Sequence, residues 1–276
     1  MKTANFLFTA ILVFLFVCNT ACQNRPNKEK SSVAGRKGSS SRFVSIDGTR
    51  FIDPDGRHLI LHGINIVNKN PEVNYLGQET FETFGKLKKY GFNCVRLGLI
   101  WDGLEPEPGM YDERYLQGID QRIRWAEEHG LYVYLDMHQD LFSIKFSDGA
   151  PEWATLDEGL PHERGAIWSD SYLISPAVQT AFDNFWKNAP APDGMGIQDH
   201  YINAWKFVAE RYADNPIVIG YDIMNEPFMG SAANGIMPAL LTAYATILVE
   251  KTGQAPPSEE ELVMMWAQEE SRLKVL

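Results

Sequence analysis

The sequence predicts an α/β protein: a (β/α)8 TIM barrel, of which about the first four β/α units are present, preceded by an N-terminal β-hairpin. Short apolar runs alternate with amphipathic stretches, and glycines end several of these stretches, as is typical of parallel strands joined by crossover helices. Polar residues gather where the apolar runs end. In a barrel, the carboxyl ends of the strands form the edge at which active sites are built.

The folded part is expected to begin with a hairpin. Residues 43–46 and 50–52 are rich in β-forming side chains and flank an Asp47-Gly48 pair, which favours a tight turn between two strands. After a second turn, residues 58–64 form an apolar run that we expect to be the first barrel strand.

Two helix–strand pairs follow this strand. Residues 80–90 are predicted to be helical because large apolar side chains recur on one face, and Gly91 ends the helix before a strand at 93–99. Residues 113–129 form a second amphipathic pattern, which precedes an apolar strand at 131–136. These strands are apolar almost throughout, as expected when both faces of a sheet are covered.

A long aromatic loop separates these elements from the last predicted ones. Residues 201–212 are expected to be helical, residues 218–224 to form the fourth strand, and residues 238–251 to form the next helix. The chain then ends in a helical stretch at 258–276, which has no evident counterpart to four further strands.

Charge and composition exclude several classes of function. The chain has 276 residues and a formal net charge of −11, the wrong sign for binding a nucleic-acid backbone, so we expect no nucleic-acid partner. No glycine-rich phosphate loop follows a strand, so the sequence indicates no nucleotide cofactor. Three cysteines cannot form a disulfide framework, and Cys94 is expected to be an inert core residue because it lies in an apolar run.

The first residues are expected to direct export. Residues 1–22 contain Lys2, a short apolar core and small residues, a pattern typical of a signal peptide. Thr20-Ala21-Cys22 resembles a bacterial lipobox, which implies lipidation of Cys22; cleavage nearby without a lipid is the alternative. Residues 23–42 are expected to be a disordered linker, and residues 43–276 the folded domain. The protein would then be secreted or exposed at the cell surface, anchored by lipid to a bacterial membrane.

Two polar residues near strand ends have more than one interpretation. Arg96 lies inside an apolar strand, where a buried charge needs a partner, so it forms either a structural ion pair or part of a site. His138 follows the third strand within Asp136-Met137-His138-Gln139-Asp140, and taken alone it is either a structural histidine with its hydrogen bonds satisfied or a catalytic one. We predict no metal site there, because no second ligand pair at a usable spacing accompanies this run. His162 and His200 are expected to be surface or loop residues.

Asn225-Glu226-Pro227 at the end of the fourth strand is a sharper signal. Pro227 is expected to hold the turn at Glu226 extended. A glutamate partly shielded from water keeps its proton to higher pH, so it is suited to protonate a leaving oxygen, and an adjacent amide can bind a sugar hydroxyl. The alternative is a turn that simply ends a strand.

Together these residues resemble glycoside hydrolase family 5, the retaining (β/α)8 glycosidases, and in particular its endoglycoceramidase branch. The resemblance extends from about Phe43 to about Gly230. The stretches that carry it are residues 61–69, 101–106, 135–140, 148–154 and 225–227, together with the strand that contains Arg96. Endoglycoceramidases cleave the bond between glycan and ceramide in glycosphingolipids.

The resemblance implies roles for individual residues. Glu226 matches the general acid/base, and Arg96 matches the residue that supports the nucleophile. Matches to polar contacts with the sugar are Lys69, His138, Asp140 and Asn225. The family needs no metal or other cofactor. The aromatic residues of the long loop, Phe142, Phe146, Trp153 and Trp168, offer either stacking faces for a sugar or lipid, or packing against the barrel.

One part of the family pattern is missing. The family's nucleophile is a glutamate at the end of the seventh strand, and this sequence shows only four barrel strands. We therefore expect the chain to be an N-terminal fragment that ends before its nucleophile and is inactive by itself. The expected function of the complete protein is glycosphingolipid hydrolysis. Two alternatives stay open: a β-glucanase or cellulase of the same family, and a non-catalytic glycan-binding lipoprotein.

Overall fold

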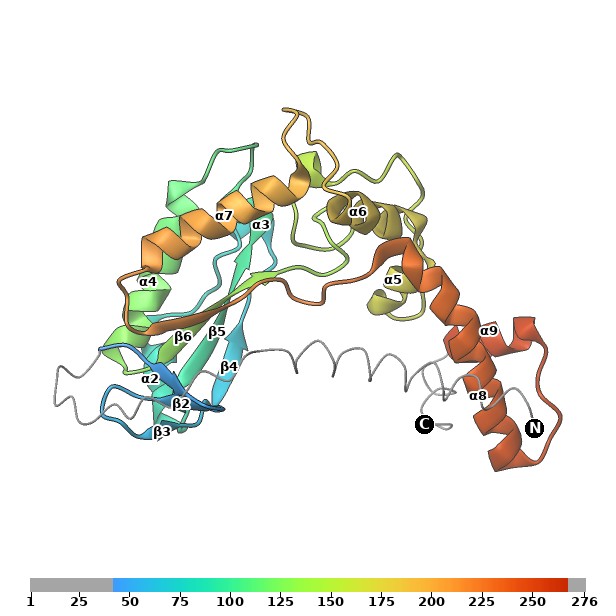
Figure 1. The fold of residues 1–276 in the computed structure, drawn as a ribbon, viewed down its shortest axis with the longest axis horizontal. Coiled ribbons are helices and arrows are strands. Elements are labelled where there is room, and N and C mark those ends of the chain that lie inside the picture. Colours follow the sequence, from blue (N-terminus) through green and yellow to red (C-terminus); the bar gives the residue numbers. More distant parts are fainter. Residues whose placement is uncertain (1–41, 268–276) are drawn as a thin grey trace, which may run out of the picture. The chain divides into compact units, whose positions relative to one another are not determined.

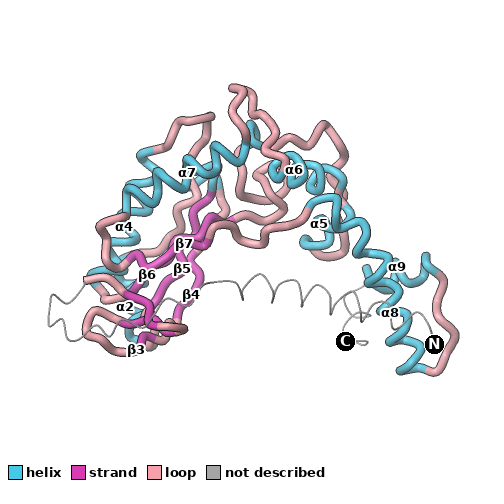
Figure 2. The backbone as a smooth tube through the Cα atoms, viewed as in Figure 1, coloured by secondary structure: helices cyan, strands magenta, loops and turns pink. Residues whose placement is uncertain are grey.

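The computed structural model of the chain describes residues 42–267. The expected signal peptide, the expected lipidation site at Cys22 and almost all of the expected linker lie outside the described residues, as do residues 268–276. The described strands form two sheets, one of three strands and one of four (Figures 1 and 2).

The first sheet is antiparallel and contains the expected hairpin. Strands β1 (Ser45–Asp47) and β2 (Arg50–Ile52) pair with Asp47 opposite Arg50, so the two turn residues are Gly48 and Thr49. The turn therefore lies one residue later than predicted, and Gly48 adopts a φ of 60°, which glycine tolerates best. A third strand, β3 (His58–Leu59), pairs with β2.

The second sheet is parallel. Its strands are β4 (Gly63–Ile66), β5 (Cys94–Ile100), β6 (Tyr132–His138) and β7 (Val218–Asp222), and they lie side by side in chain order. The alternation of strands and helices is thus confirmed, but the predicted first strand is not one element. Its first two residues belong to β3 of the antiparallel sheet, and β4 begins only at Gly63. Within residues 42–267 the four strands form an open sheet and no closed barrel.

The helices agree with the expected positions and add several in the aromatic loop. The α-helices are α2 (Phe81–Lys89), α3 (Trp101–Leu104), α4 (Glu113–Glu128), α5 (Ser171–Ile174), α6 (Pro176–Trp186), α7 (Ile197–Tyr212), α8 (Ile236–Thr252) and α9 (Glu259–Ala267). Short 3-10 helices are η1 (Pro71–Val73), η2 (Glu152–Ala154), η3 (Trp168–Asp170) and η4 (Gly230–Gly235). Helix α6 was not predicted, although Ser175 caps it by accepting from the Val178 backbone N–H and Pro176 occupies its first position.

Side chains from the helices and the sheet form one core. Phe84 of α2, Tyr115 of α4 and Val208 of α7 are fully buried with Leu97 of β5 and Leu135 of β6. Cys94 is 1% exposed, so its predicted burial is confirmed, and burial raises the pKa of its thiol to about 11.

The side chains of β4 to β7 that point away from this core line a pocket of about 510 Å³. Asn65, Arg96, Tyr134 and Gly220 are among its lining residues. Register places Asn65 opposite Arg96 and Arg96 opposite Tyr134, so the polar side chains of this face lie in one row across the strands.

Helices α8 and α9 pack on each other and form a small cluster of their own around Leu241, Tyr244 and Leu262. Gly230–Thr252, which comprises η4 and α8, is 23 residues long and contains an 18-residue window with a mean hydropathy of 1.5. This length and composition would suffice to cross a membrane, and helices in the cores of globular proteins share both properties.

Candidate active site

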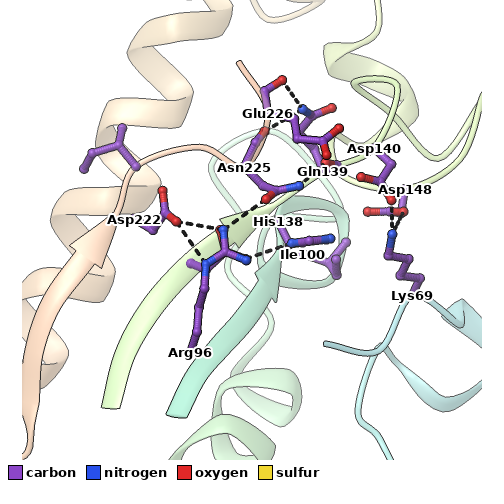
Figure 3. Close-up of polar contacts among 12 residues, drawn as sticks. Lys69, Arg96, Ile100, His138, Gln139, Asp140, Asp148, Asp222, Asn225 and Glu226 are labelled. Carbon is purple, nitrogen blue, oxygen red and sulfur yellow. Dashed lines mark hydrogen bonds and ion pairs between the residues drawn. The ribbon is translucent and has the colours of Figure 1, made fainter. Parts of the chain in front are cut away.

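The carboxyl ends of β4 to β7 bring together the residues singled out in the sequence. Lys69 follows β4, Arg96 lies in β5, His138 ends β6, and Asn225 and Glu226 follow β7. Because the strands are parallel, these ends meet at one edge of the sheet. Figure 3 shows the side chains at this edge and the hydrogen bonds and ion pairs that join many of them.

Arg96 links three strands. Its Nη2 atom lies 2.8 Å from Oδ1 of Asp136 in β6 and 2.7 Å from Oδ2 of Asp222 in β7. The same nitrogen donates to Oδ1 of Asn225 at 3.0 Å (Figure 3). The two interpretations of Arg96, a structural ion pair and a part of the site, are therefore compatible. Arg96 forms a buried ion pair and also contacts a residue of the Asn-Glu-Pro turn.

His138 is held by the same ion-pair group. Its Nδ1 atom lies 2.8 Å from Oδ2 of Asp136, and its side chain is 10% exposed. This contact fixes the ring and leaves Nε2 as the nitrogen that can face a ligand. Burial raises the pKa of the Asp136 carboxyl group, while His138 and Arg96 oppose that shift.

Lys69 bridges two acidic residues. Its ammonium group contacts Asp140 and lies 3.3 Å from Oδ2 of Asp148 (Figure 3). Asp148 is 1% exposed, its Oδ1 has no hydrogen-bond partner, and burial raises the pKa of its carboxyl group despite the opposing charge of Lys69. The sequence analysis gave Asp148 no role.

His138, Asp140 and Asp148 also offer ligand atoms within 4.8 Å of one another. Asp148 was not predicted as a ligand, because it reaches the site from a loop eight residues beyond Asp140. The ammonium group of Lys69 contacts both carboxylates, so the cation position between them is occupied by this chain's own side chain. Such an arrangement suits the binding of hydroxyl groups, since it offers donors and acceptors side by side.

The turn that carries Glu226 differs from the prediction. Glu226 has a φ of 46°, so its backbone is left-handed rather than extended. Gln139 contacts this turn: its Nε2 atom donates to the carbonyl oxygens of Asn225 at 2.6 Å and Glu226 at 2.9 Å. The side chain of Glu226 is exposed, which differs from the partial shielding expected, and its Oε2 accepts from the hydroxyl of Tyr172 at 3.2 Å.

One histidine prediction was wrong. His200 is 2% exposed and lies in α7, where Nδ1 is 3.0 Å from Oε1 of Glu105 and Nε2 is 3.1 Å from Oδ2 of Asp193. Glu105 is itself fully buried and also accepts from Nε1 of Trp101 at 2.8 Å. A single histidine in a helix gives no signal of such carboxylate partners, because they come from other parts of the chain. His162 lies in a loop, as predicted.

The aromatic loop divides into packed and exposed side chains. Phe142 is 2% exposed, and Phe146 and Trp153 are half-buried against the main core, so packing is the correct interpretation for these three. Trp168 differs because it is 53% exposed, and its ring lies 6.2 Å from that of Tyr172, the residue that contacts Glu226.

Four residues of the site were missed in the sequence: Gln139, Asp148, Tyr172 and Asp222. Gln139 and Asp148 lie inside stretches that carry the family resemblance, so those stretches contained a signal. No sequence signal marked Tyr172 or Asp222, because the contact of Tyr172 with Glu226 and that of Asp222 with Arg96 arise only in the tertiary structure.

Comparisons with known proteins agree with this geometry. Residues 52–257 match the family model described as "Cellulase (glycosyl hydrolase family 5)". An endoglycoceramidase of Hydra vulgaris is 32% identical over 225 residues, which cover 70% of this chain and 42% of that protein. Endoglycoceramidase I of Rhodococcus hoagii (strain 103S) is 35% identical over 195 residues, which cover 68% and 37%.

Solved structures give the same result. Endo-glycoceramidase II from Rhodococcus sp., in its ganglioside GM3 complex, superposes with a TM-score of 0.60 and 37% identity, covering 72% of this chain and 47% of that one. The chain thus spans less than half the length of these relatives. Because the family model covers most of the described residues and these include the strand-end site, the chain belongs to glycosyl hydrolase family 5.

Proposed function

We propose that the complete protein is a retaining glycosidase that cleaves the bond between glycan and ceramide in glycosphingolipids. The observation that carries the proposal is the position of Glu226. It follows β7 at the edge where Lys69, His138 and Asn225 also lie, and the hydrogen bonds of Gln139 tie its turn to the end of β6.

In the proposed mechanism, Glu226 is the general acid/base. Its carboxyl group gives a proton to the glycosidic oxygen as the bond to the anomeric carbon breaks, while a second carboxylate attacks that carbon and forms a glycosyl-enzyme. Glu226 then takes a proton from water, and the resulting hydroxide displaces the second carboxylate and releases the sugar. That carboxylate must lie about 5–5.5 Å from Glu226, and we propose that it comes from a part of the barrel outside β4 to β7.

The remaining strand-end residues would bind the sugar next to the scissile bond. Lys69 and Asp140 present a donor and an acceptor, and Nε2 of His138 adds a third polar atom. The amide of Asn225 is oriented by Arg96 at Oδ1 and by the Gln139 carbonyl at Nδ2, so it can meet a sugar hydroxyl in a fixed direction. Arg96 would support the nucleophile through the same ion-pair group.

Two observations favour a lipid leaving group over a second sugar. The relatives named above are endoglycoceramidases, and one of their structures holds ganglioside GM3. On this chain, the exposed ring of Trp168 lies beside Tyr172, which contacts the proposed acid Glu226. Because the acid protonates the leaving group, this apolar face lies on the side where the ceramide would depart.

The test uses the protein translated from the complete reading frame. We expect it to release intact oligosaccharide and ceramide from GM3, with cellulose oligomers cleaved poorly or not at all. Glu226→Gln removes the acid and should lower kcat by about 10³-fold, while Glu128→Gln on the exposed side of α4 should not. If cellulose oligomers are cleaved in preference to GM3, the proposed substrate is wrong and the protein is a β-glucanase. Binding of GM3 without cleavage would leave only the glycan-binding alternative.

We also propose that the protein is exported and anchored by lipid at Cys22. The proposal rests on residues 1–22, whose charge, apolar core and small residues are typical of a signal sequence. An anchor would hold the enzyme at a bilayer surface, where a glycosphingolipid is found. Labelling of growing cells with a palmitate analogue should mark the wild-type protein and not Cys22→Ser. A wild-type protein that stays unlabelled would rule out the anchor.

A further inference from the structure

Gln139 lies at the centre of the contacts that hold the Glu226 turn. It follows β6 directly and is 5% exposed. Its amide nitrogen donates to consecutive carbonyl groups, those of Asn225 and Glu226, at 2.6 and 2.9 Å (Figure 3), and more weakly to the hydroxyl of Tyr172 at 3.4 Å. The backbone oxygen of Gln139 accepts in return from Nδ2 of Asn225 at 3.1 Å.

The Gln139 side chain is itself fixed in one orientation. Its Oε1 atom accepts from the backbone N–H of Phe142 at 2.5 Å, so the amide cannot turn over without placing its oxygen against two carbonyl oxygens. Gly149 packs directly against it, because a Cβ at that position would lie 2.5 Å from Cβ of Gln139. Gly149, in a stretch that carries the family resemblance, is therefore the residue that leaves room for this side chain.

The turn needs this support because its conformation is unfavourable in isolation. A residue that precedes proline avoids helical backbone conformations, and a positive φ is rare for a residue with a side chain. Glu226 combines both conditions, with Pro227 after it and a φ of 46°. Such conformations persist where surrounding contacts determine them, and they are frequent at functional sites. The two hydrogen bonds from Gln139 act on the carbonyl groups on either side of Glu226.

We propose that Gln139 is a positioning residue that sets the direction of the Glu226 carboxyl group for proton transfer. The inference rests on the proposed role of Glu226 as general acid/base. Gln139 acts mainly through the backbone of residues 225 and 226, and its longer contact with the Tyr172 hydroxyl at 3.4 Å adds to this, because that hydroxyl donates to the Glu226 carboxylate. Loss of the amide donors frees the turn to relax toward an extended backbone, and the carboxyl group then moves away from the glycosidic oxygen.

The kinetic test compares variants of the protein translated from the complete reading frame. Gln139→Met keeps the length of the side chain and removes its donors, so kcat for GM3 should fall by about 100-fold, while KM changes by less than about threefold. Gln139→Glu should lose as much activity at pH 7, and part of the loss should be recovered at acidic pH, where the protonated carboxyl group again donates one hydrogen bond. Gln198→Met, which removes an amide that donates to the Phe185 carbonyl, should leave kcat unchanged.

A second measurement does not depend on catalysis. Hydrogen–deuterium exchange of this chain should be faster at residues 224–228 in Gln139→Met and unchanged there in Gln198→Met. Unchanged exchange at 224–228 in Gln139→Met overturns the inference, as does a kcat within about threefold of the wild type. If exchange increases but neither wild type nor variants hydrolyse any glycoside, the proposed function fails and the structural role of Gln139 at this turn is retained.

Discussion

The guanidinium group of Arg96 lies 2.8 Å from the carboxylate of Asp136, whose side chain is completely buried. The carboxylate of Asp136 also contacts the ring of His138, and the guanidinium group of Arg96 also pairs with Asp222. One ion-pair group therefore connects β5, β6 and β7 below the strand-end site. Because a buried carboxylate has no water to solvate it, this group must stay intact for the strand ends to keep their positions.

Replacement of Arg96 should therefore be costly. Arg96→Met removes the guanidinium group from the buried Asp136 carboxyl group, and we expect the free energy of unfolding to fall by about 3 kcal/mol, as for other broken buried pairs. Urea unfolding measures the change. The control is Arg57→Met, which breaks ion pairs with Asp53 and Asp55. Because the Arg57 side chain is 72% exposed, this variant should lose much less stability. Equal losses for the two variants would contradict the structural role of Arg96.

Replacement of Asp148 by a neutral residue should raise the stability of the fold, whereas replacement of Arg96 should lower it. Burial raises the pKa of its carboxyl group above the unfolded value, so ionisation of Asp148 lowers the stability of the folded state at pH values above the folded pKa, and this cost is absent at low pH. Asp148→Asn is neutral at all pH values, and we expect its melting temperature to exceed that of the wild type at pH 7. The advantage should disappear as the pH falls through the folded pKa of Asp148, because the wild-type group then becomes neutral as well.

The same variant tests the proposed sugar site. The amide of Asp148→Asn no longer balances the charge of Lys69, so glycan affinity should fall by at least about tenfold, a loss of roughly 1.4 kcal/mol. Isothermal titration with the oligosaccharide measures this loss. Asp214→Asn, at a fully exposed side chain, is the control for both measurements. A variant that is less stable than the wild type at pH 7 would show that the charge of Asp148 stabilises the fold.

Glu105 and His200 form a buried pair that should stabilise the fold through its hydrogen bonds. Glu105 accepts from Trp101, from His200 and from the backbone N–H of Gly109. Glu105→Gln replaces one accepting oxygen by a donor, so at least one partner is left unsatisfied and the free energy of unfolding should fall by about 1–3 kcal/mol. Chemical denaturation measures the loss, with the exposed Glu107→Gln as control. An unchanged stability would show that the pair rearranges at no cost.

Acid stability should depend on Arg211. Its hydrogen bonds to Glu113 are the largest cause of the lowered pKa of that carboxyl group. The pKa of Asp120 is also lowered, because hydrogen bonds from Arg211 and Tyr212 outweigh the effect of burial. A lowered folded pKa gives stability that is present above the unfolded pKa, about 4, and is lost as the pH falls through the folded value.

Arg211→Met should accordingly lower stability at pH 7 and flatten its dependence on pH between about pH 5 and pH 2. Melting temperatures measured across that range test this expectation. Arg114→Met, on an exposed position of α4, should keep the wild-type slope. A slope that stays unchanged in Arg211→Met would show that other carboxyl groups cause the acid sensitivity.

The elements of the fold could be predicted wherever a local pattern encodes them. The helices at 81–89 and 113–128 follow from amphipathic repeats, and the parallel order of the strands follows from their alternation with helices. The run at 58–64 misled the prediction, because an apolar run does not say which sheet its residues join. His58 and Leu59 pair with β2, and the parallel sheet begins only at Gly63.

The sequence by itself determined which residue types stand at the strand ends, including Glu226, since each motif is contiguous in the chain. Only the tertiary structure decided what surrounds them. Gln139 donates to the carbonyl groups of the Glu226 turn, where φ is positive, Asp148 lies beside Lys69, and His200 is buried between two carboxylates. The physical reason is that burial and hydrogen-bond partners depend on residues far apart in the chain, whereas hydrophobic periodicity and turn propensity depend on near neighbours.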